Sequence, residues 1–338
     1  LQVGHPPGAP LYMMIGRFFS LFASDTDQLA KMINAVSAFA SAFTILFLFW
    51  TISHFLVKMK LNKVIILGGA FVGAMAYTFS DSFWFSAVES EVYSTSSLFT
   101  AVVFWAILKC ENVADKPGAN RWLILIAYLM GLSIGVHLLN LLAIPAIVLV
   151  YYFRKYDVSR KGIIYALGIS LAILLLIMYG IIPGIVKVAT LVEKLFTNSY
   201  GIHNNVGFVV YLILLLAALV YGIYRTQYLK KSVVWNTALV CITVIIIGYS
   251  SYAMIMVRSL AAPPMNENRP EIVFALLSYL NREQYGDRPL VMGHLYDAEV
   301  KDVVYKKPVY ILDKENNRYE VAFRKAELEM SGSKVLLP

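Results

Sequence analysis

Repeated apolar stretches about as long as a bilayer is thick constrain the fold of this chain most. A helix needs ~20 consecutive, mainly apolar residues to cross the hydrocarbon layer. The stretches fall at about 29–57, 64–80, 91–109, 162–183, 206–225 and 233–256. They lack the alternating pattern of a transmembrane β-strand, which needs only ~9–11 residues. The sequence therefore predicts an all-α polytopic membrane protein.

Composition supports the same class. The chain is 59% hydrophobic and 15% charged, against roughly 25% charged in a soluble domain. Its net charge of +8 comes mainly from loops that we assign to the cytoplasmic side, where anionic lipid head groups attract them. We therefore expect membrane lipids as partners and no nucleic acid.

The apolar region 122–153 is too long for one crossing. As a single helix it would extend ~48 Å, whereas the hydrocarbon layer is ~30 Å thick. Basic residues flank it on both sides, so the positive-inside rule places both ends in the cytoplasm. Two short helices must then meet near 135–140, which puts His137 and Asn140 at membrane depth. With this pair the sequence predicts about eight crossings.

Loop charge also predicts the orientation. Two basic loops are predicted on the same side of the membrane, one with Lys58, Lys60 and Lys63 and the other at 225–231. The loops predicted on the opposite side, 80–94 and 184–205, contain few basic residues. We therefore expect a multi-pass protein of a bacterial inner (cytoplasmic) membrane whose two chain ends face the periplasm.

Three regions follow from these assignments. Residues 1–28 form a periplasmic loop and a juxtamembrane helix starting near Leu11, residues 29–256 form the transmembrane domain, and residues 257–338 begin a small α+β periplasmic domain. Within the last region we expect an amphipathic helix at 270–281 and a hairpin of 303–312 with 318–323. The chain resembles a fragment that continues at both ends.

The segment Gly4–Pro10 is the first candidate site. Prolines fix their own φ and favour extended conformations in the preceding residue, so His5 is presented by a rigid element with Pro6 and Pro7. The alternative is a proline-rich entry into the following helix, since proline is common at helix starts.

Ionisable groups at membrane depth, or where an outside loop enters a span, form the second set of candidates, which we call the membrane-mouth residues. Glu89 and Glu91, beside Tyr93, could bind a cation, orient a sugar or act as a base, or they could simply favour the N-terminus of the next helix. His137 between two apolar half-helices needs a hydrogen-bonding partner, for which Asn140 is the neighbouring candidate, although both could serve packing.

A polar stretch leaves the last span. Arginine binds phosphate in a bidentate manner, so this stretch could hold a lipid phosphate or could only anchor the tail to head groups. Its members are Arg258, Asn266, Asn268, Arg269 and Arg282.

Four motifs together resemble a known family. They are Val3–Tyr12 with its His-Pro-Pro, Ala76–Tyr93, Gly131–Asn140 and Pro264–Asn268. This combination resembles a multi-spanning bacteroidete membrane family of formerly unknown function, which is similar to protein O-mannosyltransferases of the GT-C glycosyltransferase superfamily.

The resemblance implies a GT-C-like helical bundle and an inverting transfer of a sugar, mannose or a similar hexose. The donor would be a polyprenyl-phosphate sugar, bound as substrate rather than as cofactor, and the acceptor a Ser or Thr of an exported protein. We assign no metal ligands and leave a divalent-metal requirement open. The acidic residue expected as base in this family would precede Leu1.

Within the chain the resemblance suggests catalytic roles for His5, Glu89 and Glu91. Pro6 and Pro7 would support His5, Tyr93 would orient sugar or acceptor, and His137 with Asn140 would lie near the lipid phosphate. Arg258, Asn266, Asn268 and Arg269 complete the predicted substrate-binding set.

Two other functions also fit a membrane protein with polar groups inside it. A transporter or flippase of lipid-linked glycans needs such groups too, but many of these folds carry internal repeats, and no repeat is visible here. A non-catalytic subunit of an envelope complex is the third possibility.

Overall fold

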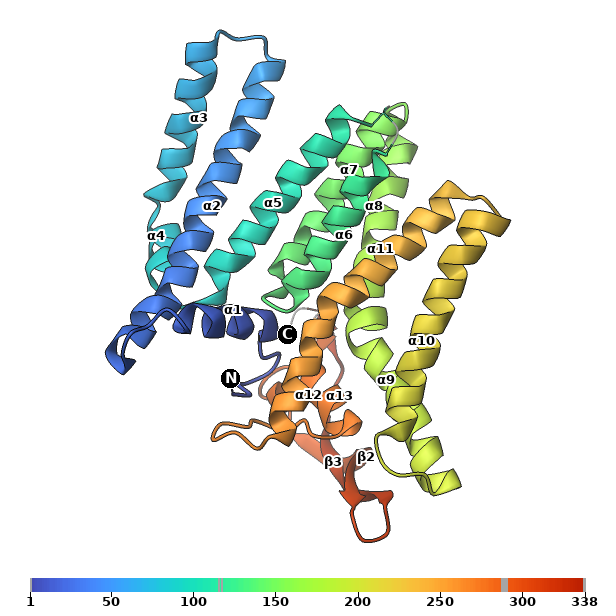
Figure 1. Cartoon of the computed structure of the whole chain (residues 1–338). Helices are drawn as coiled ribbons and strands as arrows, with labels where there is room; N and C mark the ends of the chain where they lie inside the picture. Colours follow the sequence, from blue (N-terminus) through green and yellow to red (C-terminus); the bar gives the residue numbers. More distant parts are fainter. Residues whose placement is uncertain (1, 115, 117, 287–290, 337–338) are drawn as a thin grey trace. The chain divides into compact units, whose positions relative to one another are not determined.

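The computed structural model describes residues 2–114, 116, 118–286 and 291–336 (Figure 1). Helices account for most of them. They are α1 (Pro10–Ser20), α2 (Leu29–Lys58), α3 (Lys63–Thr78), α4 (Asp81–Val88), α5 (Val92–Asn112), α6 (Asn120–Ile134), α7 (Ile144–Lys155), α8 (Arg160–Leu175), α9 (Ile182–Lys194), α10 (Val206–Tyr224), α11 (Val233–Tyr249), α12 (Ala253–Leu260) and α13 (Val273–Leu280). The strands are β1 (Met292–Gly293), β2 (Val300–Asp313), β3 (Arg318–Met330) and β4 (Val335–Leu336).

The chain forms two compact units. Unit 1 contains Gly8–Ile181 and Ala218–Arg258, and unit 2 contains Gln2–Pro7, Ile182–Ala217 and Ser259–Pro338. The predicted tail, from Ser259 on, thus shares a unit with Gln2–Pro7 and with the region around α9.

The helices confirm the predicted class of all-α polytopic membrane protein with a small C-terminal sheet region. Among the described residues, six helical segments are long and apolar enough to cross a membrane. They are Thr26–Lys58, Val92–Asn112, Leu138–Lys155, Arg160–Ser199, Val206–Leu229 and Val233–Leu260. The pair α3 and α4, bent by 69°, makes a seventh if it counts as one span, and α6 is a shorter apolar helix.

Small and hydroxyl-bearing residues let the helices of unit 1 approach closely. Between α2 and α5, which pack together (Figure 1), the buried side chains include Ser37, Ser41, Ser94 and Thr95. Between α6 and α11, a Cβ added at Gly131 would meet the α11 backbone. These contacts bury polar and glycine surfaces inside the unit and leave many large apolar side chains exposed, as a bilayer requires.

The break predicted in region 122–153 is present. Helix α6 ends at Ile134, and a 3-10 turn over Leu138–Ala143 leads into α7. His137 is extended, with φ −159° and ψ 140°, and it caps the turn by accepting a hydrogen bond at Nδ1 from the backbone N–H of Leu139, at 3.1 Å.

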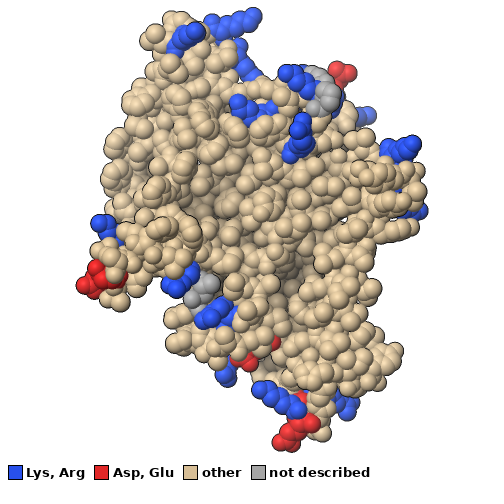
Figure 2. Space-filling view, in the orientation of Figure 1, with Lys and Arg blue, Asp and Glu red and all other residues tan. Residues whose placement is uncertain are grey.

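Basic loops of unit 1 meet at one end of its helices. Lys58 Nζ lies 2.7 Å from a carboxylate oxygen of Glu111, and Arg154 Nε donates to the backbone carbonyl of Glu111 at 3.3 Å. Figure 2 shows the basic side chains gathered where α2 turns into α3 and α7 into α8, beside a largely uncharged surface. The loops therefore share an end, and the side of the membrane that this end faces stays a prediction.

Two predicted loops contain helices. Region 80–94 includes α4, whose Phe83 is buried, and region 184–205 is helical up to Ser199. We predicted a span up to about residue 183 followed by a loop, but the helical segment Arg160–Ser199 continues through Pro183, which lies just after the π-helical turn Leu176–Ile181. The buried face of α9, with Val186 and Ala189, stabilises the helix.

Unit 2 holds the predicted helix and hairpin. Helix α13 packs against α9, and β2 pairs antiparallel with β3 in the register Asp313↔Arg318. Asp313 closes the turn between the strands. Its carboxylate accepts hydrogen bonds from the Asn316 side chain and from the backbone N–H groups of Glu315 and Asn316. These bonds, that of the Asn316 side chain first, lower the pKa of Asp313. Both strands extend beyond the predicted limits.

Candidate functional site

The N-terminal segment of unit 2, Gln2–Pro7, forms a strap that is held by the motif at 264–268. Val3 forms a parallel bridge with Asn266, in which its N–H donates to the carbonyl of Met265 at 3.0 Å. Tyr279 of α13 donates its hydroxyl to the carbonyl of Gly4 at 2.7 Å. Burial, with the nearby charges of Glu267 and Tyr285, raises the pKa of Tyr279, so this donor keeps its proton. Two motifs separated by most of the chain are thus joined.

His5 projects from this strap. Pro6 is buried, and its carbonyl accepts a hydrogen bond from the Tyr285 hydroxyl at 3.4 Å, whereas the His5 side chain is exposed. Pro7 is partly buried. The His5 imidazole is therefore exposed beside a buried proline, and its predicted role stays a prediction.

The other predicted residues of unit 2 differ in their surroundings. Asn266 accepts from the Ser259 hydroxyl at 2.8 Å and donates to its carbonyl, so it fixes the loop after α12. Asn268 donates to Gln284 at 2.6 Å. Arg269 is largely exposed and has its Nε 3.6 Å from Glu271. Of the three, Arg269 is the most accessible to a ligand.

In unit 1 the start of α1 contacts the two other motifs. Leu11 donates its N–H to the carbonyl of Gly135 at 2.8 Å, and the hydroxyls of Tyr12 and Ser90 lie 3.1 Å apart. Tyr12 also packs in a small core with Val136. The Val3–Tyr12 motif therefore touches both remaining motifs through its last residues.

The predicted membrane-mouth residues lie around the start of α5. The rings of Tyr93 and His137 are 5.3 Å apart between centroids, which joins the second and third motifs directly. Glu89 ends α4 and Glu91 precedes α5, and both side chains are exposed. Two accessible carboxylates therefore stand beside a tyrosine that contacts a histidine.

Asn140 is buried and has specific partners. Its amide oxygen accepts from the Thr100 hydroxyl at 3.1 Å, and its amide nitrogen lies 3.2 Å from the Met130 sulfur. We expected Asn140 to be the partner of His137, but its amide is directed toward these two side chains. Asn140 therefore links α5 to the helix break through Thr100.

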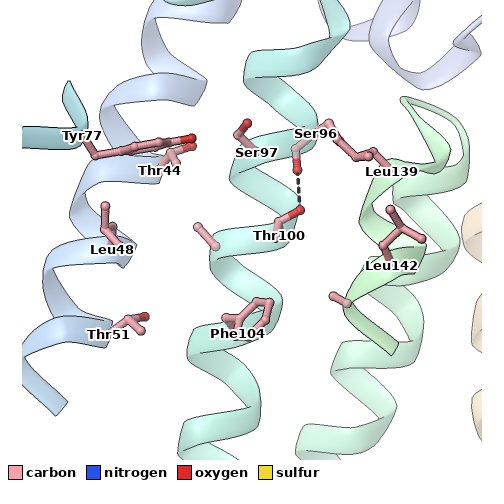
Figure 3. Close-up of a pocket in the computed structure, with 12 residues that line it drawn as sticks. Thr44, Leu48, Thr51, Tyr77, Ser96, Ser97, Thr100, Phe104, Leu139 and Leu142 are labelled. Carbon is pink, nitrogen blue, oxygen red and sulfur yellow. Dashed lines mark hydrogen bonds between the residues drawn. The ribbon is translucent and has the colours of Figure 1, made fainter. Parts of the chain in front are cut away.

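Next to this contact lies a cavity of about 570 Å³ in unit 1 (Figure 3). Half of its lining residues carry hydroxyls, and sequence reasoning did not identify them. They are Thr44, Thr51, Tyr77, Ser96, Ser97 and Thr100. The Ser96 side chain is 1% exposed, and its hydroxyl has no hydrogen-bond partner among the described residues. The run Ser94-Thr-Ser-Ser97 in an apolar helix was the available signal.

Arg258 is partly buried near the end of α12. Within the part of the chain that the structure describes, no three His, Cys, Asp or Glu side chains form a group that could hold a metal ion.

Comparisons with known proteins find similarity to protein O-mannosyl-transferases. Residues 1–160 match the family model of the protein O-mannosyl-transferase TMEM260 N-terminal domain. A protein O-mannosyl-transferase tmem260 from Dictyostelium discoideum is 24% identical over 187 residues, which are 54% of this chain and 22% of that relative. No solved structure matches the chain. In its N-terminal half, which contains three of the four motifs, the chain is therefore similar to protein O-mannosyl-transferases.

Proposed function

We propose that this protein is a membrane glycosyltransferase that moves a sugar, mannose or a similar hexose, from a polyprenyl-phosphate carrier to Ser or Thr of an exported protein. The proposed reaction takes place at the periplasmic face of a bacterial inner membrane. One observation carries most weight: the residues that match the transferase domain contact one another, Tyr12 with Ser90, Leu11 with Gly135 and Tyr93 with His137.

In the proposed GT-C-type inverting reaction, the acceptor hydroxyl attacks the anomeric carbon of the sugar. The bond from that carbon to the phosphate oxygen breaks, the phosphate leaves with the electron pair, and a carboxylate takes the hydroxyl proton. Exposed side chains suit direct contact with the acceptor or the sugar better than buried ones, because they can reach a substrate. Glu89 and Glu91 would hold the acceptor or sugar, and His5 would shape the site.

Buried groups would act through others. Asn140 is bonded to Thr100, so in this proposal it is a positioning residue that holds α5 against the helix break. Tyr93 is exposed, and its ring is tilted by 54° against that of His137, so in this proposal it would orient the imidazole beside the carrier phosphate. The hydroxyl-lined cavity would accept part of the carrier between α2, α5 and the helix break.

The test is transfer of labelled sugar from a polyprenyl-phosphate sugar to a Ser/Thr peptide by the full-length protein in vesicles. We expect His5→Ala and Glu91→Gln each to lower kcat by about a hundredfold, the usual scale of a lost catalytic or polar transition-state contact. Matched controls are His203→Ala and Glu329→Gln, because these side chains are also exposed but lie outside the motifs.

Unchanged transfer in both variants would remove His5 and Glu91 from the site. Absence of any transfer by the wild-type protein, under conditions in which a lipid-linked glycan crosses the bilayer, would favour a flippase instead.

A further inference from the structure

The loop between α4 and α5 carries the two predicted carboxylates. Glu89 follows α4, Glu91 precedes α5, and Ser90 lies between them. All three residues are exposed. The N–H of Glu91 donates to the carbonyl of Glu89 at 2.9 Å, so the loop makes a tight turn centred on Ser90 with one acid on either side. A group that holds Ser90 therefore holds both acids.

Tyr12 of α1 provides such a group. Its hydroxyl and that of Ser90 lie 3.1 Å apart, which is within hydrogen-bonding distance. The contact joins residues that are 78 positions apart in the chain. It therefore ties the first helix of unit 1 to the apex of the acidic turn.

The Tyr12 ring is itself held by the surrounding helices. It is 9% exposed and packs with Val36 of α2 and with Val136, which follows α6. Val92 and Phe99 of α5 pack against the same group. Because three other elements hold the ring, its hydroxyl reaches Ser90 from a fixed position.

Two serines hold the end of the loop that enters α5. The hydroxyls of Ser37 and Ser94 donate to the carbonyl of Glu91, at 3.4 and 3.2 Å. Both serines are fully buried. They fix the last residue of the loop, and the contact with Tyr12 fixes its apex.

We propose that Tyr12 is a positioning residue, which acts through Ser90 to hold Glu89 and Glu91 where they meet the acceptor or the sugar. This inference rests on the proposed function, in which those carboxylates contact the substrate. Ordering an exposed loop costs conformational entropy, and a contact made before the substrate binds has already offset that cost. A displacement of about 1 Å at a reacting group can lower the rate about a hundredfold, so the hydroxyl of Tyr12 controls the reaction without touching the substrate.

The test removes single hydroxyls from the full-length protein and measures sugar transfer in vesicles. Tyr12→Phe removes one hydroxyl and keeps the packed ring, Ser90→Ala removes its partner, and Ser90→Thr keeps a hydroxyl at that position. Tyr12→Phe and Ser90→Ala should each lower kcat about two- to tenfold, the scale of one lost hydrogen bond. KM should change less than about twofold, because the acids act mainly in the transition state.

The combined variants separate positioning from a structural role. If the two hydroxyls act through each other, the double variant should lose no more activity than either single variant. Ser90→Thr should retain most of the wild-type kcat. Tyr221→Phe is the matched control, because it removes an exposed hydroxyl from α10 within the same unit.

The outcomes distinguish this proposal from the proposed function. Wild-type kcat in both single variants, additive losses in the double variant, or a Ser90→Thr protein as slow as Ser90→Ala would overturn the positioning role of Tyr12 and leave the transferase standing. Absence of transfer by the wild-type protein would contradict the proposed function instead.

Hydrogen–deuterium exchange tests the hold on the loop without any sugar transfer. In Tyr12→Phe the amide of Glu91 and the amides in the first turn of α5 should exchange about two- to tenfold faster than in the wild type, because one hydrogen bond is lost. Tyr221→Phe should exchange there like the wild type. Wild-type exchange of the loop in Tyr12→Phe would overturn the proposal, whether or not the protein transfers sugar.

Discussion

Replacing Glu193 tests how unit 2 is held together. The Glu193 side chain is fully buried and accepts hydrogen bonds from four donors. One carboxylate oxygen accepts from the N–H of Asn205 at 2.6 Å, from the Tyr319 hydroxyl at 2.9 Å and from Thr197 at 3.2 Å. The other accepts from the N–H of Phe208 at 2.8 Å.

This carboxylate joins three parts of the unit. Asn205 and Phe208 lie at the start of α10, where backbone N–H groups have no intrahelical partner and the helix dipole favours a negative charge. Tyr319 belongs to β3, and burial together with Glu193 raises the pKa of its hydroxyl. Glu193 thus connects α9, α10 and the hairpin.

The two substitutions should differ in cost. Glu193→Gln keeps the shape but turns an amide N–H toward at least one donor, which costs about 1–3 kcal/mol. Glu193→Ala leaves all four neutral donors without this acceptor, and because each buried unsatisfied donor costs about 1–3 kcal/mol, it should cost more than Glu193→Gln.

Hydrogen–deuterium exchange of the full protein in detergent measures the local loss of stability caused by each substitution. Since every 1.4 kcal/mol is tenfold, Glu193→Gln should speed exchange at the start of α10 by about 5- to 150-fold, and Glu193→Ala by more. Glu329→Gln, an exposed acid on β3, is the control. Wild-type protection in both Glu193 variants would refute the reasoning.

Three other changes have defined outcomes. Gly207→Ala should lower the unfolding temperature, because the new Cβ would lie 2.8 Å from the α9 backbone; a normal unfolding temperature would contradict that contact. Gly248→Ala should also destabilise, since its Cβ would collide with the α6 backbone, whereas Gly168→Ala, which meets nothing within 4 Å, should not. Burial opposes ionisation of Glu283, but hydrogen bonds from Lys325 and Ser278 outweigh it and lower its pKa. The folded-state pKa lies below the unfolded value, so this stabilisation is complete above about pH 4.5 and is lost as the pH falls through the folded pKa. Lys325→Met should flatten that dependence in thermal unfolding between about pH 3 and 6, and an unchanged profile would show that the pair contributes nothing.

Patterns within one segment predicted most of the fold. Apolar length identified the spans, and the excess length of region 122–153 indicated the break before His137, because a bilayer has a fixed thickness. Turn-forming residues at 313–317 located the hairpin. The helix continues beyond the predicted end at residue 183, because α9 has a buried face that includes Val186 and Ala189.

Contacts between distant segments could not be predicted. Nothing near Glu193 shows that Tyr319 will donate to it, and nothing near Val3 shows that it will pair with Asn266. For the candidate site, the sequence located the four motifs but did not show which motif contacts which. It paired His137 with Asn140, whereas packing directs Asn140 to Thr100.

The central claim is the transfer of a sugar to exported proteins, and mass spectrometry of intact glycopeptides tests it in cells. Deleting the gene should remove hexose from Ser and Thr of exported proteins. Restoring the wild-type gene should return the hexose, and restoring the His5→Ala gene should return little. Unchanged hexose on these proteins after deletion, with lipid-linked glycans accumulating instead, would contradict the account.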